Sequence, residues 1–232
     1  MNLPVYDVVL LPAPEQYQLS IIISRRLERY GTDFTLADGE RYPHLSLYMA
    51  NLTAENVEKA KAALTGIAAH TPALSLEATG YAHDVEQGMF EVGYEKTDGI
   101  VRVQQAIIDA INPLRTGLRA RDPVGRILAD WLPRTSGEAR ENLEQYGYDE
   151  IGELFRPHIT CTRFKQRYHK ADTAALPPLA ALSAVFLTLG LYEMGEHGTC
   201  TRTVFTTPLA ADQDMIRDST LFLTGQPACP GA

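Results

Sequence analysis

The sequence predicts an α+β fold, in which short strands of antiparallel sheet alternate with helices. Runs rich in β-branched residues occur in both halves of the chain, separated by stretches with helical periodicity. The expected order is strand, helix, strand, helix, hairpin, helices, strand, hairpin. The sequence PHLSL at 43–47 is also echoed by PHITC at 157–161, so the two halves share a feature.

The first half of the chain contains the clearest helix signals. An apolar run at 4–14 ends in prolines, and the next segment places apolar residues at helical spacing and stops at Gly31. The segment that opens with Thr53 consists of strong helix formers behind a good N-cap. We therefore expect strand 4–14, helix 15–30, strand 44–52, helix 53–70 and two strands within 73–96 around a loop at 84–88.

The second half is expected to alternate in the same way. Residues 98–117 place four isoleucine or valine side chains on one face, which predicts a helix. One or two short helices are expected within 118–148, and a strand follows in RPHITCTRF at 156–164. The runs SAVFLTLGLYEM and TCTRTVFTTPL flank GEHG, which is typical of a β-hairpin.

Composition excludes several classes of protein. The chain has 232 residues, 45% of them hydrophobic, and a net charge of −8, so binding to duplex nucleic acid through a broad basic surface is not expected. Cys161, Cys200 and Cys229 have no CxxC spacing, which argues against a disulfide framework. No apolar run approaches the roughly 20 residues of a membrane span, and no signal peptide is recognisable. We expect a cytoplasmic protein without membrane contact.

The two echoed stretches place polar side chains on one side of an apolar strand. In an extended strand His44, Ser46 and Tyr48 share a face. By the same alternation His158, Thr160 and Thr162 share a face. Each strand therefore offers one apolar face to the core and one face with an imidazole and hydroxyls to a cleft.

Two imidazoles across a cleft suit acid–base chemistry on a phosphodiester. One neutral histidine can take a proton from the attacking group while the other protonates the leaving oxygen. Hydroxyls two residues further along can donate hydrogen bonds to phosphate oxygens. This scheme requires neither a metal nor a cofactor.

The pattern gains its specificity from the pair. About 0.7 chance matches to H-x-[ST] are expected in such a chain, so one match carries no information. A third match, His197-Gly198-Thr199, lies in the predicted hairpin turn, and we interpret it as coincidence. The other two share a preceding proline and an intervening Leu or Ile.

These motifs resemble those of the 2H phosphoesterase superfamily, the LigT-like or 2′-5′ RNA ligase-like proteins. The signature of that family is two H-x-[ST]-x tetrads, one in each half, which read HLSL at 44–47 and HITC at 158–161. The run LTLGLYEM also resembles the last-lobe strand of the family. The resemblance extends from Val5 to about Thr207.

The resemblance implies a bilobal, pseudo-twofold fold, in which two antiparallel sheets form a central cleft with helices outside. The expected domain covers 1–211, with 97–148 as a helical intervening region and 212–232 as a C-terminal tail. The implied activity is metal-independent hydrolysis of a 2′,3′-cyclic phosphate, or of a related cyclic or 2′-5′ linkage. By the same match His44 and His158 are acid and base, and Ser46 and Thr160 hold the phosphate; Ser46 replaces the commoner threonine.

Further residues are candidates for binding the small nucleotide or oligonucleotide substrate. Tyr48 and Thr162 share the face of the motifs, and Arg41 and Arg156 stand just before them. An arginine-rich segment at 114–140 could line the cleft and steer an anion, although a solvated helix face is the more common explanation for such a segment.

Two other classes of function remain open. The same cleft could hold a nucleotide or RNA end without turning it over, or the histidines could ligate a catalytic metal. The sequence disfavours a zinc site, because no Asp, Glu or Cys stands at ligand spacing beside either motif histidine and Cys161 is expected to face away from His158. His70, His83 and His169 have no such partners and are interpreted as structural or exposed.

Overall fold

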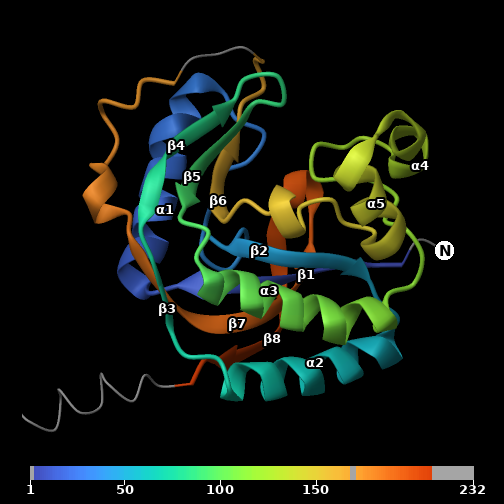
Figure 1. The fold of residues 1–232 in the computed structure, drawn as a ribbon. Helices are drawn as coiled ribbons and strands as arrows, with labels where there is room; N and C mark the ends of the chain where they lie inside the picture. Colours follow the sequence, from blue (N-terminus) through green and yellow to red (C-terminus); the bar gives the residue numbers. More distant parts are fainter. Residues whose placement is uncertain (1–2, 168–170, 211–232) are drawn as a thin grey trace, which may run out of the picture.

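The computed structural model describes residues 3–167 and 171–210, so the tail predicted at 212–232 lies outside the described residues. The described chain forms an antiparallel sheet of eight strands with helices against it (Figure 1). The strands are β1 (Val5–Pro12), β2 (Leu45–Asn51), β3 (Leu74–Leu76), β4 (Ala78–Asp84), β5 (Met89–Tyr94), β6 (His158–Arg163), β7 (Ala184–Met194) and β8 (Cys200–Pro208). The helices are α1 (Pro14–Leu27), α2 (Ala54–Ala69), α3 (Asp98–Ile111), α4 (Leu128–Trp131) and α5 (Gly137–Tyr146). The predicted α+β class is confirmed.

The strands form two groups that meet at the motifs. Their order is β3-β7-β1-β2-β6-β5-β4, and β8 also pairs with β7. Instead of two separate sheets, the groups make one sheet that is joined where β2 pairs with β6 through Leu45 and Ile159. These two residues hold the same position in their motifs, so the antiparallel pairing creates a local twofold relation between the two motif strands.

Helices pack behind both groups of strands. Thr53 and Thr97 cap α2 and α3 by accepting a backbone N–H with the side-chain oxygen, as N-cap threonines do. Helices α2 and α3 lie side by side against β2, β7 and β8, whereas α1 contacts β6 and β1 (Figure 1). The side chains between these layers form the main apolar core.

The intervening region 97–148 contains α3, α4 and α5, and the sequence predicted helices there. Helix α3 ends at Ile111, six residues before the predicted boundary at 117, because Pro113 cannot donate the hydrogen bond that would continue it. Gln104 of α3 donates to the carbonyl oxygens of Leu47 (3.1 Å) and Glu150 (2.9 Å). The region thereby ties the helix layer to β2 and to the segment that precedes β6.

Each motif strand contains a register shift just after its hydroxyl residue. Val8 pairs with Tyr48 and Val9 with Ser46, which leaves Leu47 without a partner in β1. In the second motif Cys161 is skipped in the same way between Thr162 and Thr160. Such a bulge reverses the alternation of side chains beyond it. Both motifs therefore present a histidine and a hydroxyl, but not the next hydroxyl residue, to the same face of the sheet.

Candidate active site

A cavity of about 160 Å³ lies over the junction of β2 and β6 and brings the four motif side chains together. Its lining includes His44, Ser46, His158 and Thr160. The pairing of Leu45 with Ile159 sets His44 opposite Thr160 and Ser46 opposite His158. One small ligand can therefore contact both imidazoles and both hydroxyls.

The two histidine rings are held in the same way. Nδ1 of His44 lies 2.7 Å from the carbonyl oxygen of Tyr42, and Nδ1 of His158 lies 2.6 Å from that of Arg156. A carbonyl oxygen only accepts, so each Nδ1 carries a hydrogen. The other nitrogen, Nε2, is left in each ring to accept or donate a proton.

The surroundings of His44 are buried and contain one acidic residue. Ser46 donates to Oδ2 of Asp7 at 2.7 Å, and Nε2 of His44 lies 3.7 Å from the same oxygen. Burial lowers the pKa of His44 to about 4, and burial raises the pKa of Asp7 to about 8. Oδ1 of Asp7 is buried and has no hydrogen-bond partner in the described part of the chain.

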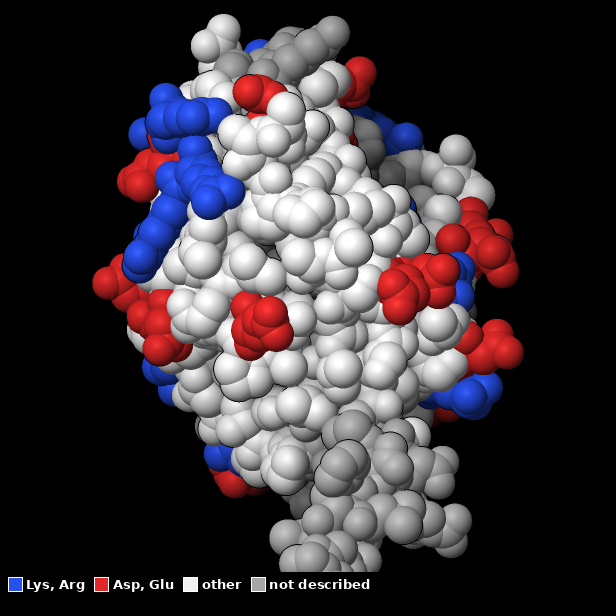
Figure 2. Space-filling view, turned by 90° about the vertical axis from the view of Figure 1, so that its left-hand side faces the viewer, with Lys and Arg blue, Asp and Glu red and all other residues white. Residues whose placement is uncertain are grey.

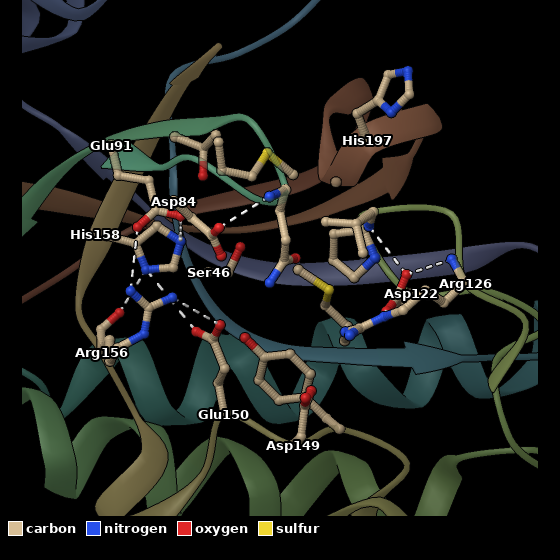
Figure 3. Close-up of a pocket in the computed structure, with 18 of the residues that line it drawn as sticks. Ser46, Asp84, Glu91, Asp122, Arg126, Asp149, Glu150, Arg156, His158 and His197 are labelled. Carbon is tan, nitrogen blue, oxygen red and sulfur yellow. Dashed lines mark hydrogen bonds and ion pairs between the residues drawn. The ribbon is translucent and has the colours of Figure 1, made fainter. Parts of the chain in front are cut away.

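His158 is more exposed and stands among charged groups. Its Nε2 lies 3.6 Å from Oε1 of Glu91, and its Nδ1 lies 4.0 Å from Oε2 of Glu150. Arg156 lies between the two glutamates and pairs with each at 3.3 Å (Figure 3). The ring of His158 is thus part of a charged network, in contrast to that of His44.

The opposite wall is built from a loop and a turn (Figure 3). Asp122 accepts hydrogen bonds from the backbone of Val124 and Arg126 and pairs with the Arg126 side chain, which fixes the loop. His197, in the β7–β8 turn, has a φ of 60°, which is unusual for a residue with a side chain. Arg163 donates to Nδ1 of His197 at 2.9 Å, so that nitrogen carries no hydrogen.

Three of the residues predicted to bind substrate lie elsewhere. Tyr48 is fully buried, with its hydroxyl at 2.6 Å from the carbonyl oxygen of Tyr146, and Thr162 is fully buried and donates to that of Phe34. Both lie beyond a bulge, which turns them away from the pocket. Met49 takes the place expected for Tyr48 in the lining. Arg41 is not among the residues lining the pocket and pairs with Glu40, whereas Arg156 does line it.

Other groups in the lining were not identified from the sequence. The carboxylates come from Asp84, Glu91, Asp122, Asp149 and Glu150. Nothing in the spacing of these residues connects them with the motifs, because they reach the pocket from separate strands and loops. His197 begins the third H-x-[ST] match, which lies in the β7–β8 turn and lines the pocket from there. Of the arginine-rich segment 114–140, Arg126 lines the pocket.

The pocket therefore carries more acidic than basic side chains. Its two arginines are already paired, Arg156 with Glu91 and Glu150, and Arg126 with Asp122. An incoming phosphate consequently depends on the Thr160 hydroxyl and on the histidine Nε2 atoms for its hydrogen bonds, because the single hydroxyl proton of Ser46 is donated to Asp7.

Glu150 offers a test of how burial affects this network. Its pKa is raised, chiefly by burial, with additions from Glu91 and Asp149, whereas His158 and Arg156 act in the opposite direction. The folded protein then binds this proton more tightly than the unfolded chain. Above the ordinary pKa of 4.5, stability therefore falls as pH rises toward the folded-state value.

Glu150→Gln is expected to remove this loss. The free energy of unfolding of the variant, relative to that of the unmodified chain, should increase between about pH 5 and about pH 8. Urea denaturation at both pH values measures it. Glu153→Gln is the matched control, because the Glu153 side chain is 92% exposed. A variant that loses stability relative to the unmodified chain as pH rises would contradict the assignment.

Helices that could cross a membrane are absent from the described residues: none is both long and apolar enough.

Comparisons with known proteins identify the fold. No family model and no curated protein sequence matches this chain. Among solved structures, E. coli LigT complexed with ATP matches with a TM-score of 0.54 at 14% identity, covering 90% of this chain and 99% of LigT. The protein TT0787 of Thermus thermophilus matches with a TM-score of 0.54 at 15% identity, covering 90% and 100%. A structure described as a phosphoesterase matches with a TM-score of 0.53 at 13% identity, covering 90% of this chain and 99% of that chain.

Proposed function

From the LigT-like phosphoesterase fold of this chain, we propose that it is a metal-independent phosphodiesterase. Its substrate would be a cyclic phosphate, such as a 2′,3′-cyclic nucleotide or RNA end, or a small cyclic or 2′-5′ oligonucleotide. The observation that carries the proposal is the convergence of His44, Ser46, His158 and Thr160 on one pocket, with both Nδ1 atoms bound to backbone carbonyls.

The surroundings of the histidines suggest different roles. Burial keeps the pKa of His44 near 4, so its ring is neutral at neutral pH and can accept a proton from the attacking water. His158 then protonates the leaving ribose oxygen. A bond forms between phosphorus and the water oxygen, and the bond between phosphorus and the ribose oxygen breaks. Thr160 donates to a non-bridging oxygen as negative charge builds on it, and Ser46 does the same once its single hydroxyl proton turns from Asp7 to the phosphate.

Small ligands fit this proposal better than long nucleic acids. LigT has been crystallised with ATP, with 3′-AMP and with NADP+. The net charge of this chain is −8, and Figure 2 shows a face where Lys and Arg gather at one edge beside a wide uncharged area. Such a face does not offer a phosphate backbone the continuous row of cations that tight, sequence-independent binding requires.

The direct test is turnover. We expect the purified chain to open nucleoside 2′,3′-cyclic phosphates or to cleave short 2′-5′ or cyclic oligonucleotides, and to do so unchanged in the presence of EDTA. The variant with both His44→Ala and His158→Ala should turn over these substrates at least about 100-fold more slowly. Turnover that stops on chelation and returns with a divalent metal would overturn the metal-independent scheme. Tight nucleotide binding without product would point to a binding module instead.

Two threonines of β6 provide a matched pair. Thr160→Val removes a hydroxyl from the pocket and is expected to lower kcat about 100-fold, as loss of one donor to a developing oxyanion does. Thr162→Val removes a hydroxyl that bonds the Phe34 carbonyl in the core. It should cost about 1–3 kcal/mol of stability and leave kcat unchanged. Steady-state kinetics and urea denaturation of both variants separate these effects; equal losses of kcat would contradict the assigned orientations.

A further inference from the structure

Three potential metal ligands come together beneath the candidate active site. Asp7 lies in β1, His44 immediately precedes β2 and Cys200 begins β8. One ligand atom from each, a carboxylate oxygen, a ring nitrogen and a sulfur, lies within 4.8 Å of the other two. All three residues are buried, Asp7 and Cys200 completely.

The hydrogen bonds around this cluster suit a metal site. Nδ1 of His44 is bound to the Tyr42 carbonyl, which leaves Nε2 facing Asp7 at 3.7 Å. Metal-binding histidines usually have the distal nitrogen held in this way. Ser46 supports the carboxylate by donating to its Oδ2. Hydrogen bonds of this kind to a ligand carboxylate are also common around metal sites.

A second observation points to a missing partner. Oδ1 of Asp7 is completely buried and accepts no hydrogen bond from the described residues. A buried carboxylate oxygen without a partner is costly. A cation between the carboxylate, the imidazole and the sulfur would remove this cost.

We propose that Asp7, His44 and Cys200 form a binding site for Zn²⁺. One oxygen, one nitrogen and one sulfur ligand suit zinc, whereas Mg²⁺ and Ca²⁺ prefer sites made of oxygen alone. Binding displaces the Cys200 thiol proton and the Asp7 carboxyl proton to solvent, so that the thiolate and the carboxylate become the ligands. His44 lines the active-site pocket, which gives the ion a path of entry.

This site has a consequence for turnover, and that part rests on the proposed function. The lone pair of His44 Nε2 cannot accept a proton while it binds a metal. Zinc occupancy and the action of His44 as a base therefore exclude each other. Zinc is expected to act as an inhibitor of this enzyme and not as its cofactor.

Calorimetric titration of the chelator-treated chain with Zn²⁺ tests the site without any substrate. One equivalent should bind, and Cys200→Ala should weaken binding at least tenfold. Cys161→Ala is the matched control, because Cys161 is also fully buried but lies outside the cluster. Cys229→Ala shows whether the third cysteine of the chain also binds Zn²⁺, and its affinity should equal that of the unmodified chain. No binding, or equal binding by Cys200→Ala, overturns the proposal. If Cys200→Ala does not fold, Asp7→Asn replaces it and should weaken binding at least tenfold; equal binding by Asp7→Asn likewise overturns the proposal.

Inhibition is then measured with the best cyclic-phosphate substrate. Zinc should reduce the turnover of the unmodified chain and of Cys161→Ala, and EDTA should restore it. Cys200→Ala should require at least tenfold more zinc for the same fractional loss. If no substrate is turned over, the titration still decides the metal site, so failure of the proposed function and failure of this inference remain distinguishable. Inhibition that is identical in Cys200→Ala would assign it to another site.

Discussion

Replacing His158 by alanine is expected to lower kcat for a 2′,3′-cyclic phosphate by about 100- to 10,000-fold, the usual loss when a positioned acid or base is removed. His44→Ala should cause a loss of similar size. The two histidines act together as base and acid in one reaction, so removing either disables the pair. The double variant should therefore be little slower than the worse single variant. Steady-state kinetics with product analysis measures these losses.

The control for both variants is His70→Ala. His70 ends α2, outside the pocket, and its Nδ1 bonds the Gly66 carbonyl of the same helix. The His70→Ala variant should retain the full kcat of the unmodified chain. Single variants at His44 and His158 that keep more than about a tenth of kcat would show that the two rings do not perform the chemistry.

Truncation of Leu45 is expected to destabilise the fold strongly. Leu45 is completely buried and pairs with Ile159, where the two groups of strands meet. Leu45→Ala should lower the free energy of unfolding by about 2–5 kcal/mol, through lost burial and the cavity left behind. Urea denaturation measures this loss. Turnover should also fall, because small displacements of catalytic groups are expensive.

Leu187→Ala is the comparison for Leu45→Ala. Leu187 lies in β7 and is 36% exposed, so its truncation should change stability by only about 0.5 kcal/mol. Comparable losses in the two variants would mean that the junction between β2 and β6 has no special importance for the fold.

Much of the fold could be predicted because local signals agree with the final packing. Helix α2 begins directly after Thr53, and the helical segment that starts with α1 ends just before Gly31. Strand β1 ends at the prolines that follow its apolar run. The two H-x-[ST] motifs identified the two strands, β2 and β6, whose junction lies beneath the pocket. These signals depend on a few neighbouring residues, which a single sequence displays directly.

The remaining features depend on contacts between distant segments. The bulges at Leu47 and Cys161 have no glycine or proline to announce them, so strict alternation placed Tyr48 and Thr162 in the cleft. Asp7 reaches Ser46 across the β1–β2 ladder, 39 positions along the chain. Glu91 meets Arg156 across 65 positions of the chain, because β5 pairs with β6. No periodicity within one segment could have indicated these encounters.

The carboxylates around the pocket also bear on which anions can enter it. A cyclic phosphodiester carries one negative charge, whereas an oligonucleotide or a nucleoside triphosphate brings several into the same field. Repulsion grows with each added charge, and hydroxyls compensate it only at the phosphate that they contact. Under the proposed function we therefore expect cyclic mononucleotides to be preferred over the more highly charged oligonucleotides, and added salt should weaken this preference. Selectivity for weakly charged substrates would then be a property of the entrance, independent of any recognition of the base.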